Sequence, residues 1–167
     1  MDKLTNQLAF EHLQAQFGSR IESIGEPHDL LTILVQPEDI LDVLSFVKTN
    51  EILRFNYLTD ITAVHYPNQL KQYAVVYHVH NMFQNIRLRI KVFVGGEIPT
   101  IPSATSVWKG ANWMERETYD FFGIIFDGHP DLRRILNMDE LDVFPMRKEY
   151  PLEDPNRVDK KDFYFGR

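Results

Sequence analysis

The segment 86–94, IRLRIKVFV, alternates apolar and mostly basic side chains over its whole length. Its apolar positions are Ile86, Leu88, Ile90, Val92 and Val94, and Arg87, Arg89 and Lys91 stand between them. Successive side chains of a β-strand point to opposite faces, so the pattern predicts a strand with one face in a core and the other facing solvent or a partner. The chain must therefore build at least one half-buried sheet.

Four more strands are predicted around this one, and their residues are 20–24, 30–35, 54–65 and 73–80. A first helix is predicted at residues 5–17, and a second begins at Pro37, because proline suits the first helical position. Short polar links between consecutive strands favour antiparallel pairing. The expected fold is therefore an α+β, two-layer domain with a mainly antiparallel sheet of about five strands and helices on one face.

The pattern changes in the last third of the chain. Pro99 and Pro102 are expected to block regular structure, and a third helix is predicted at residues 107–122 with a break at Gly110 and an end at Gly123. Beyond it, prolines recur and apolar periodicity fades, which predicts an extended C-terminal arm that lies on a partner. The resulting division is a domain at 1–128 and an arm at 129–167.

Composition excludes several classes of function. The 167 residues carry a formal net charge of -6, which argues against a nucleic-acid partner. The sequence has no cysteine, so it offers no disulfide, thiol nucleophile or cysteine-ligated metal cluster. No secretory signal is evident, which predicts a cytoplasmic address. No apolar run approaches the roughly 20 residues of a membrane-spanning helix, so membrane association is expected through partners.

Residues 112–136 pack charged and aromatic side chains more densely than a simple fold requires. Glu117 and Asp120 lie three apart on the predicted helix, which suits either general acid–base work or salt bridges, and salt bridges are favoured. Asp127, His129 and Asp131 alternate in a way that suits either a metal site or a turn. The turn is favoured, since Gly128 and Pro130 between them are typical turn residues and no further ligand is in view.

Histidines, arginines and tryptophans suggest further alternatives. His78 and His80 lie on the same side of a predicted strand, with His65 on the adjacent strand; ordinary cross-strand pairs are favoured over a metal site. Trp108 and Trp113 are both expected in the core. The basic residues of the last third are Arg133, Arg134, Arg147 and Lys148, and the arginines are expected to anchor a protein interface, because arginine is enriched there and grips carboxylates with two-pronged geometry.

The run from Glu115 to Ile124, ERETYDFFGI, resembles the signature of the C subunits of NADH-quinone oxidoreductase, respiratory complex I. The likeness continues through Phe126, GHP at 128–130 and LRRIL at 132–136, and PMRKEYPL at 145–152 is also similar to the family. It covers about residues 30–152. One departure is Val143, which stands before Phe144 where the family more usually has glycine.

The resemblance implies a non-catalytic scaffold subunit of the peripheral arm of the complex, with an α+β domain and a C-terminal segment that wraps neighbouring subunits. It implies no cofactor or metal in this chain, with FMN, iron–sulfur clusters and quinone held by partners. The implied partners are the quinone-site subunit and neighbouring iron–sulfur subunits, at the cytoplasmic face of the cell inner membrane. The implied interface residues are Glu115, Arg116, Glu117, Asp120, His129, Arg133, Arg134, Arg147, Lys148 and Tyr150.

Two other functions stay open at this point. Similar subunits occur in membrane-bound hydrogenases and in ferredoxin-linked complexes, so the electron donor is not fixed by the resemblance. A free-standing metalloenzyme that uses Glu117, Asp120, His129 and Asp131 is the alternative from a different class.

Overall fold

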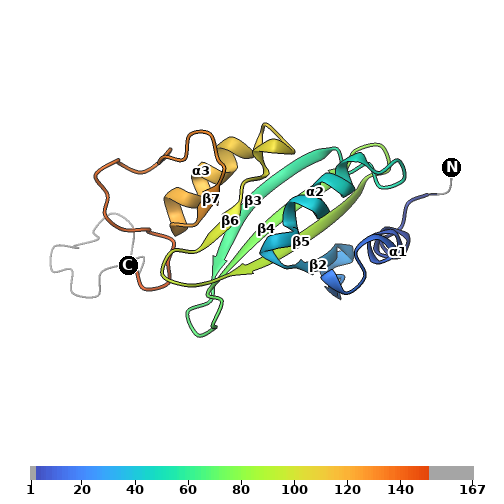
Figure 1. Ribbon diagram of the computed structural model, residues 1–167, viewed down its shortest axis with the longest axis horizontal. Coiled ribbons are helices and arrows are strands. Elements are labelled where there is room, and N and C mark those ends of the chain that lie inside the picture. The colour runs from blue at the N-terminus through green and yellow to red at the C-terminus, as the bar shows by residue number, and fades with distance from the viewer. Residues whose placement is uncertain (1–2, 151–167) are drawn as a thin grey trace, which may run out of the picture.

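The computed structural model describes residues 3–150, and its centre is one mixed sheet (Figure 1). The strands are β1 (Ile21–Gly25), β2 (Leu31–Val35), β3 (Tyr57–His65), β4 (Tyr73–Asn81) and β5 (Ile86–Val94). Their order is β1-β2-β5-β4-β3, and every junction is antiparallel except the parallel one between β2 and β5. The predicted five-stranded, mainly antiparallel α+β fold is confirmed.

Two helices, α1 (Asn6–Phe17) and α2 (Ile40–Thr49), lie over one face of this sheet (Figure 1). The hydroxyl of Thr5 accepts the Leu8 N–H at 3.2 Å and so caps the start of α1. A short 3-10 turn at Pro37–Asp39 leads into α2, in agreement with the helix start predicted at Pro37. Both helices bury one apolar stripe, so the sheet and helices share a single core.

The strand register explains which side chains form that core. One row across four strands runs Ile33, Ile90, Tyr77 and Ile61, all of them buried. On β5 the predicted alternation is confirmed, because Leu88, Ile90, Val92 and Val94 are buried while Arg87 is exposed. In residues 3–150, the Tyr77 hydroxyl is the one buried side-chain oxygen or nitrogen without a hydrogen-bond partner.

A third helix, α3 (Ala111–Phe122), packs against the edge strand β3. The Thr118 hydroxyl lies 3.2 Å from the Ile61 carbonyl oxygen and 2.8 Å from that of Met114, which ties the helix to the strand. Gly110 stands at the start of α3, and Gly123 ends it in the left-handed conformation with φ 74°. Both glycine predictions are thus confirmed. No helix of residues 3–150 is long and apolar enough to span a membrane.

Two sequence predictions near α3 are wrong. Regular structure is not blocked at the prolines, because β6 (Thr100–Pro102) pairs in parallel with β7 (Ile125–Asp127). The bonds that flank this ladder use the Pro99 carbonyl and the Ser103 N–H, so no proline N–H is needed. Trp113 is not in the core but 59% exposed, whereas Trp108 is buried and donates from its indole N–H to the Asn56 carbonyl at 3.1 Å.

The first part of the predicted arm returns to α3. The Met146 N–H donates to the Phe121 carbonyl at 3.1 Å, and the Arg147 Nε donates to the Phe122 carbonyl at 2.8 Å. The rest of the predicted arm, 151–167, lies outside the described residues, and the domain boundary at residue 128 stays a prediction. Up to Tyr150, the arm is therefore held against the body of this chain.

Gly123 is the position where this return is tightest. A Cβ placed there would lie 2.5 Å from both the Arg147 guanidinium and the Phe144 ring, and the left-handed φ disfavours side chains as well. We therefore expect Gly123→Ala to lower the free energy of unfolding by about 2 kcal/mol. Gly110→Ala is the matched control, since that glycine has helical φ and nothing within 4 Å, and it should leave stability equal or slightly higher. Urea unfolding of both variants measures the difference, and equal losses would contradict this packing.

Candidate functional site

Asp120, near the end of α3, is the most heavily hydrogen-bonded side chain of the signature. Its Oδ2 accepts the backbone N–H groups of Ile135, Leu136 and Asn137 at 3.1, 2.8 and 2.9 Å. Its Oδ1 accepts from Arg134 Nη1 at 2.7 Å and Asn137 Nδ2 at 3.0 Å. The carboxylate is fully buried, so it depends on these donors and fixes residues 134–137 on the helix.

The same donors explain the ionisation of Asp120. Burial by itself raises the pKa of the carboxyl, but the N–H groups of Asn137 and Leu136 and the Arg134 guanidinium outweigh it. The pKa is held well below its usual range. Stability from this group is therefore present above the ordinary carboxyl pKa and is lost only when pH falls toward the depressed folded-state pKa. Asp120 is a structural anion throughout the physiological range.

Two arginines complete this clamp. Arg134 Nη2 donates to the carbonyls of Leu141 at 2.5 Å and Val143 at 3.0 Å, and its guanidinium lies 5.1 Å from the centre of the Phe144 ring. Arg116 Nε and Nη2 donate to the carbonyls of Arg133 and Arg134 at 3.2 and 3.0 Å. Backbone carbonyls of the arm thus take up most guanidinium donors, and we call Asp120, Arg116 and Arg134 the arm clamp.

The end of the described arm has a second attachment. The Arg147 guanidinium stacks 4.6 Å from the centre of the Phe144 ring and 5.3 Å from that of Tyr73. The Lys148 N–H donates to His65 Nδ1 at 2.9 Å, and the His65 ring stacks on Tyr73 with centroids 4.7 Å apart. His65 therefore serves the arm, and its buried side chain points to the opposite face of the sheet from His78 and His80.

Glu115 is the second buried acid of α3, and its surroundings differ from those of Asp120. Its two oxygens accept the Ser103 hydroxyl and the Ala104 N–H, each at 2.6 Å, and no arginine or lysine reaches it within the described residues. Burial raises its pKa from 4.5 to about 7, although both hydrogen bonds oppose the rise. The pKa of the fully buried Tyr77 is also raised, mainly by burial and then by the Glu115 charge.

His129 closes the turn beside Glu115. Its Nε2 lies 3.1 Å from the Asn112 carbonyl and 4.0 Å from Glu115 Oε2, and its Nδ1 accepts the Asp131 N–H at 3.0 Å. Because a carbonyl can only accept, Nε2 carries the proton and the neutral ring uses both nitrogens. The Asp-Gly-His-Pro-Asp segment is therefore a turn, as favoured from the sequence, and Gly128 takes φ 78° in it.

The other candidate metal groups do not come together. In residues 3–150, no cluster of three or more His, Asp and Glu side chains is placed to hold a metal ion. His78 pairs instead with Arg89, whose Nε donates to its Nε2 at 2.9 Å, and His80 Nε2 lies 3.1 Å from Asn85 Oδ1. These are the cross-strand and turn contacts favoured from the sequence.

The remaining predicted site residues lie on the surface. The Arg133 side chain is 69% exposed and pairs with Asp131 at 3.0 Å, in contrast to the 9% exposed Arg134 next to it. Glu117, Lys148 and Tyr150 are also exposed. The sequence analysis missed Ser103, Asn137 and Phe144. Only Ser103 gave a local signal, as a helix-capping hydroxyl, because the other two act through contacts distant in sequence.

A family model described as "Respiratory-chain NADH dehydrogenase, 30 Kd subunit" matches residues 33–156. The C subunit of NADH-quinone oxidoreductase from Geotalea uraniireducens is 43% identical to this chain over 156 residues, which is 93% of this chain and 94% of the relative. The second of the corresponding C subunits from Rhizobium meliloti is 42% identical over 84% of this chain and 79% of the relative.

Two solved structures are similar. A trypsin-resistant fragment of Nqo5 aligns with a TM-score of 0.61 and 30% identity, over 74% of this chain and 98% of the fragment. A chain of an archaeal membrane-bound sulfane sulfur reductase aligns with a TM-score of 0.76 over 87% of this chain and 85% of its own. Its identity is 21%, so this second likeness concerns the fold alone.

The contrast between the two buried acids gives a pH test. Because the Glu115 pKa is raised in the folded state, the folded chain binds the extra proton between pH 4.5 and about 7, and stability should fall as pH rises through that window. Glu115→Gln cannot ionise and can donate to Ser103 while accepting from Ala104. We expect it to remove this slope, which is about 1.4 kcal/mol per pH unit at most. Glu117→Gln, on the exposed side of α3, is the control and should keep the slope. Urea unfolding at pH 5, 6, 7 and 8 measures it, and an unchanged slope in Glu115→Gln would refute the assignment.

Proposed function

Because this chain belongs to the family of the respiratory-chain NADH dehydrogenase 30 kDa subunit, we propose that it is a structural subunit of the peripheral arm of a proton-translocating NADH-quinone oxidoreductase. In this proposal it docks on the quinone-site subunit and neighbouring iron–sulfur subunits, at the cytoplasmic face of the inner membrane. FMN, iron–sulfur clusters and quinone reside in those partners, and this chain contributes to turnover through assembly.

The observation that carries the proposal is the use of the signature charges inside the chain. Asp120, Arg134 and Arg147 direct their side chains at the arm, and Glu115 is enclosed by Ser103 and Ala104. A catalytic carboxylate or guanidinium needs access to a substrate, whereas these groups are buried and occupied by backbone partners. This arrangement supports a role in shaping a surface.

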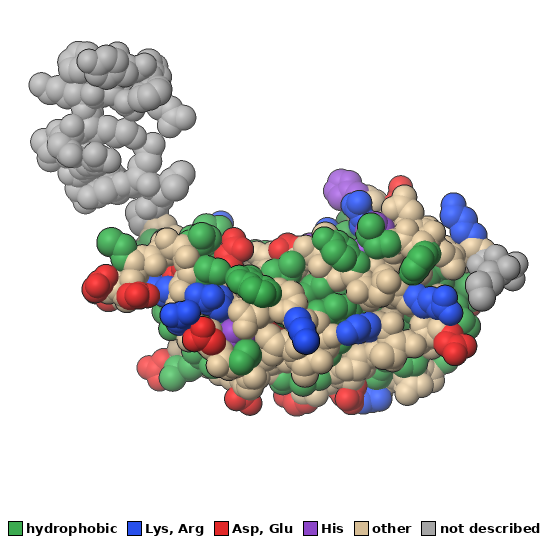
Figure 2. Space-filling model, turned by 90° about the horizontal axis from the view of Figure 1, so that it is seen from above, with side chains coloured by type: hydrophobic (Ala, Val, Ile, Leu, Met, Phe, Trp, Pro, Cys, Tyr) green, Lys and Arg blue, Asp and Glu red, His purple; other side chains and the backbone are tan. Residues whose placement is uncertain are grey.

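The surface so shaped is rich in exposed apolar groups. The arm clamp holds residues 133–137 along α3 and leaves Trp113, Leu136 and Met138 at 59%, 64% and 70% exposure. With the exposed Arg133 they form what we call the docking face. Figure 2 shows hydrophobic, acidic and basic side chains close together at the end of the molecule that carries the arm. Aromatic, Met and Arg side chains are enriched in protein interfaces, so this composition supports docking.

The test is gentle affinity purification of the tagged chain from its native membranes. With Trp113→Ala and Leu136→Ala combined, we expect recovery of partner subunits to fall roughly tenfold while the isolated chain unfolds as before, because exposed side chains contribute little to the fold. The matched control is Met82→Ala with Phe83→Ala, two exposed apolar residues of the β4–β5 turn. Equal recovery for both pairs would contradict the docking face.

The identity of the recovered partners tests the proposal itself. Quinone-site and iron–sulfur subunits together with an NADH-oxidising module would support it. A nickel–iron hydrogenase or a ferredoxin-oxidising module would assign the chain to one of the related assemblies instead. Recovery of the chain alone, with a stoichiometric metal that His129→Ala removes, would overturn the structural role in favour of the metalloenzyme.

A further inference from the structure

The face of the sheet opposite α1 and α2 is a second surface with an unusual composition. The register places Lys91 beside Val76 and Leu34, and Arg89 beside His78 and Thr32. Within residues 3–150, no helix lies over this face, because α1 and α2 cover the other one and α3 packs at the β3 edge (Figure 1). Sheets bury a face by packing another layer on it, so this face has room for a third layer.

Positive charge runs along the middle of this open face. Arg87, Arg89 and Lys91 alternate on β5, and in the described part of the chain neither Arg87 nor Lys91 forms an ion pair. Arg89 donates to His78, a contact that leaves its own positive charge in place. The acids of this face stand on the two edge strands, with Asp60 on β3 and Glu22 on β1.

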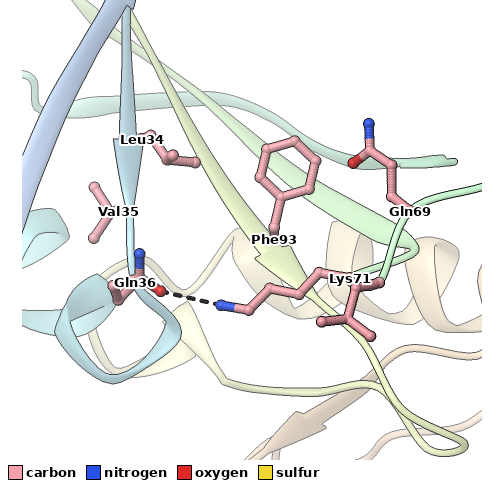
Figure 3. A pocket seen from close by; sticks show the side chains of 7 residues that line it. Leu34, Val35, Gln36, Gln69, Lys71 and Phe93 are labelled. Carbon is pink, nitrogen blue, oxygen red and sulfur yellow. Dashed lines mark hydrogen bonds between the residues drawn. The ribbon is translucent and has the colours of Figure 1, made fainter.

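An apolar hollow lies at one end of the basic strip. It has a volume of about 270 Å³, and Leu34, Phe93 and Leu70 line it (Figure 3). The Lys71 ammonium donates to Gln36 Oε1 at 3.1 Å across its rim. Leu70 is 97% exposed, and Leu34 and Phe93 are half-buried. Such a hollow suits one large apolar side chain of a partner.

We propose that this open face docks an amphipathic, acidic helix of a neighbouring subunit, which lies along β5 as a third layer. The proposal rests on the proposed function for the existence of that subunit. Basic side chains two residues apart on β5 repeat every ~7 Å, and carboxylates four apart on a helix repeat every ~6 Å, so one row can face the other. An apolar side chain of the same helix fills the hollow.

Charge complementarity favours a protein over a polyanion. Nucleic acid and anionic lipid require a broad basic field, whereas this chain carries a net charge of -6 and the strip is flanked by Asp60 and Glu22. A helix that carries one row of carboxylates meets the strip and keeps its distance from the flanking acids.

Photo-crosslinking in the assembled complex tests the occupant directly. Lys91 is replaced by benzoylphenylalanine in the full-length tagged chain, native membranes are irradiated, and the crosslinked peptide is identified by mass spectrometry. The control places the same group at Glu51, which is exposed at the end of α2. The expected result is a crosslink from position 91, absent from position 51, to an acidic helix of another subunit. A crosslink to lipid, to this chain's own residues, or to nothing would overturn the proposal.

Charge reversal gives the second readout. We expect Arg87→Glu combined with Lys91→Glu to reduce recovery of that subunit roughly tenfold. The control pair, Arg54→Glu with Lys109→Glu, carries the same charge change on exposed residues elsewhere and should have no effect. Equal recovery with both pairs would overturn the docking site. If the unaltered chain recovers no other subunit, the proposed function fails, and that outcome differs from a loss confined to the Arg87 and Lys91 pair.

Discussion

The carboxylate of Asp120 is the group on which the rest of the last third of this structure depends. Three consecutive N–H groups, one guanidinium and one side-chain amide converge on it inside the protein. Removing one partner of a buried charged network leaves the others unsatisfied, at a typical cost of ~3–5 kcal/mol. The path of the arm to Phe144, and the contact of Arg147 with Phe122, follow from that anchor.

Glu115 and Asp120 show how environment separates two acids of one helix. Both are fully buried, yet the pKa of Glu115 is raised because burial dominates over two hydrogen bonds, whereas the pKa of Asp120 is lowered because a guanidinium and several N–H groups reach it. Neither carboxyl is open to a substrate. A segment that resembles an active site in its density of charges is better explained as the attachment of an arm that presents Trp113, Leu136 and Met138.

The sequence predicted what depends on local pattern. The alternation of residues 86–94 matches the bounds of β5, and Gly123 ends α3 as expected, because period and left-handed φ are properties of neighbouring residues. It did not predict β6, since the pairing of Thr100 with Ile125 is a long-range contact. It also treated Arg133 and Arg134 alike, although one faces solvent and the other Asp120, a difference set by how the arm folds back. Family resemblance supplied the assembly role, which no local pattern contains.

The central claim is that Asp120 holds residues 134–137 on α3 within this chain. Native-state hydrogen exchange of the Ile135, Leu136 and Asn137 amides, measured on the isolated chain and on Asp120→Asn, tests it most directly. We expect all three amides to be protected in the unaltered chain and to exchange roughly a hundredfold faster in the variant, while the Glu117→Gln control matches the unaltered chain. Amides that exchange at the rate of an unfolded peptide in the unaltered chain, or equal protection in Asp120→Asn, would contradict the account.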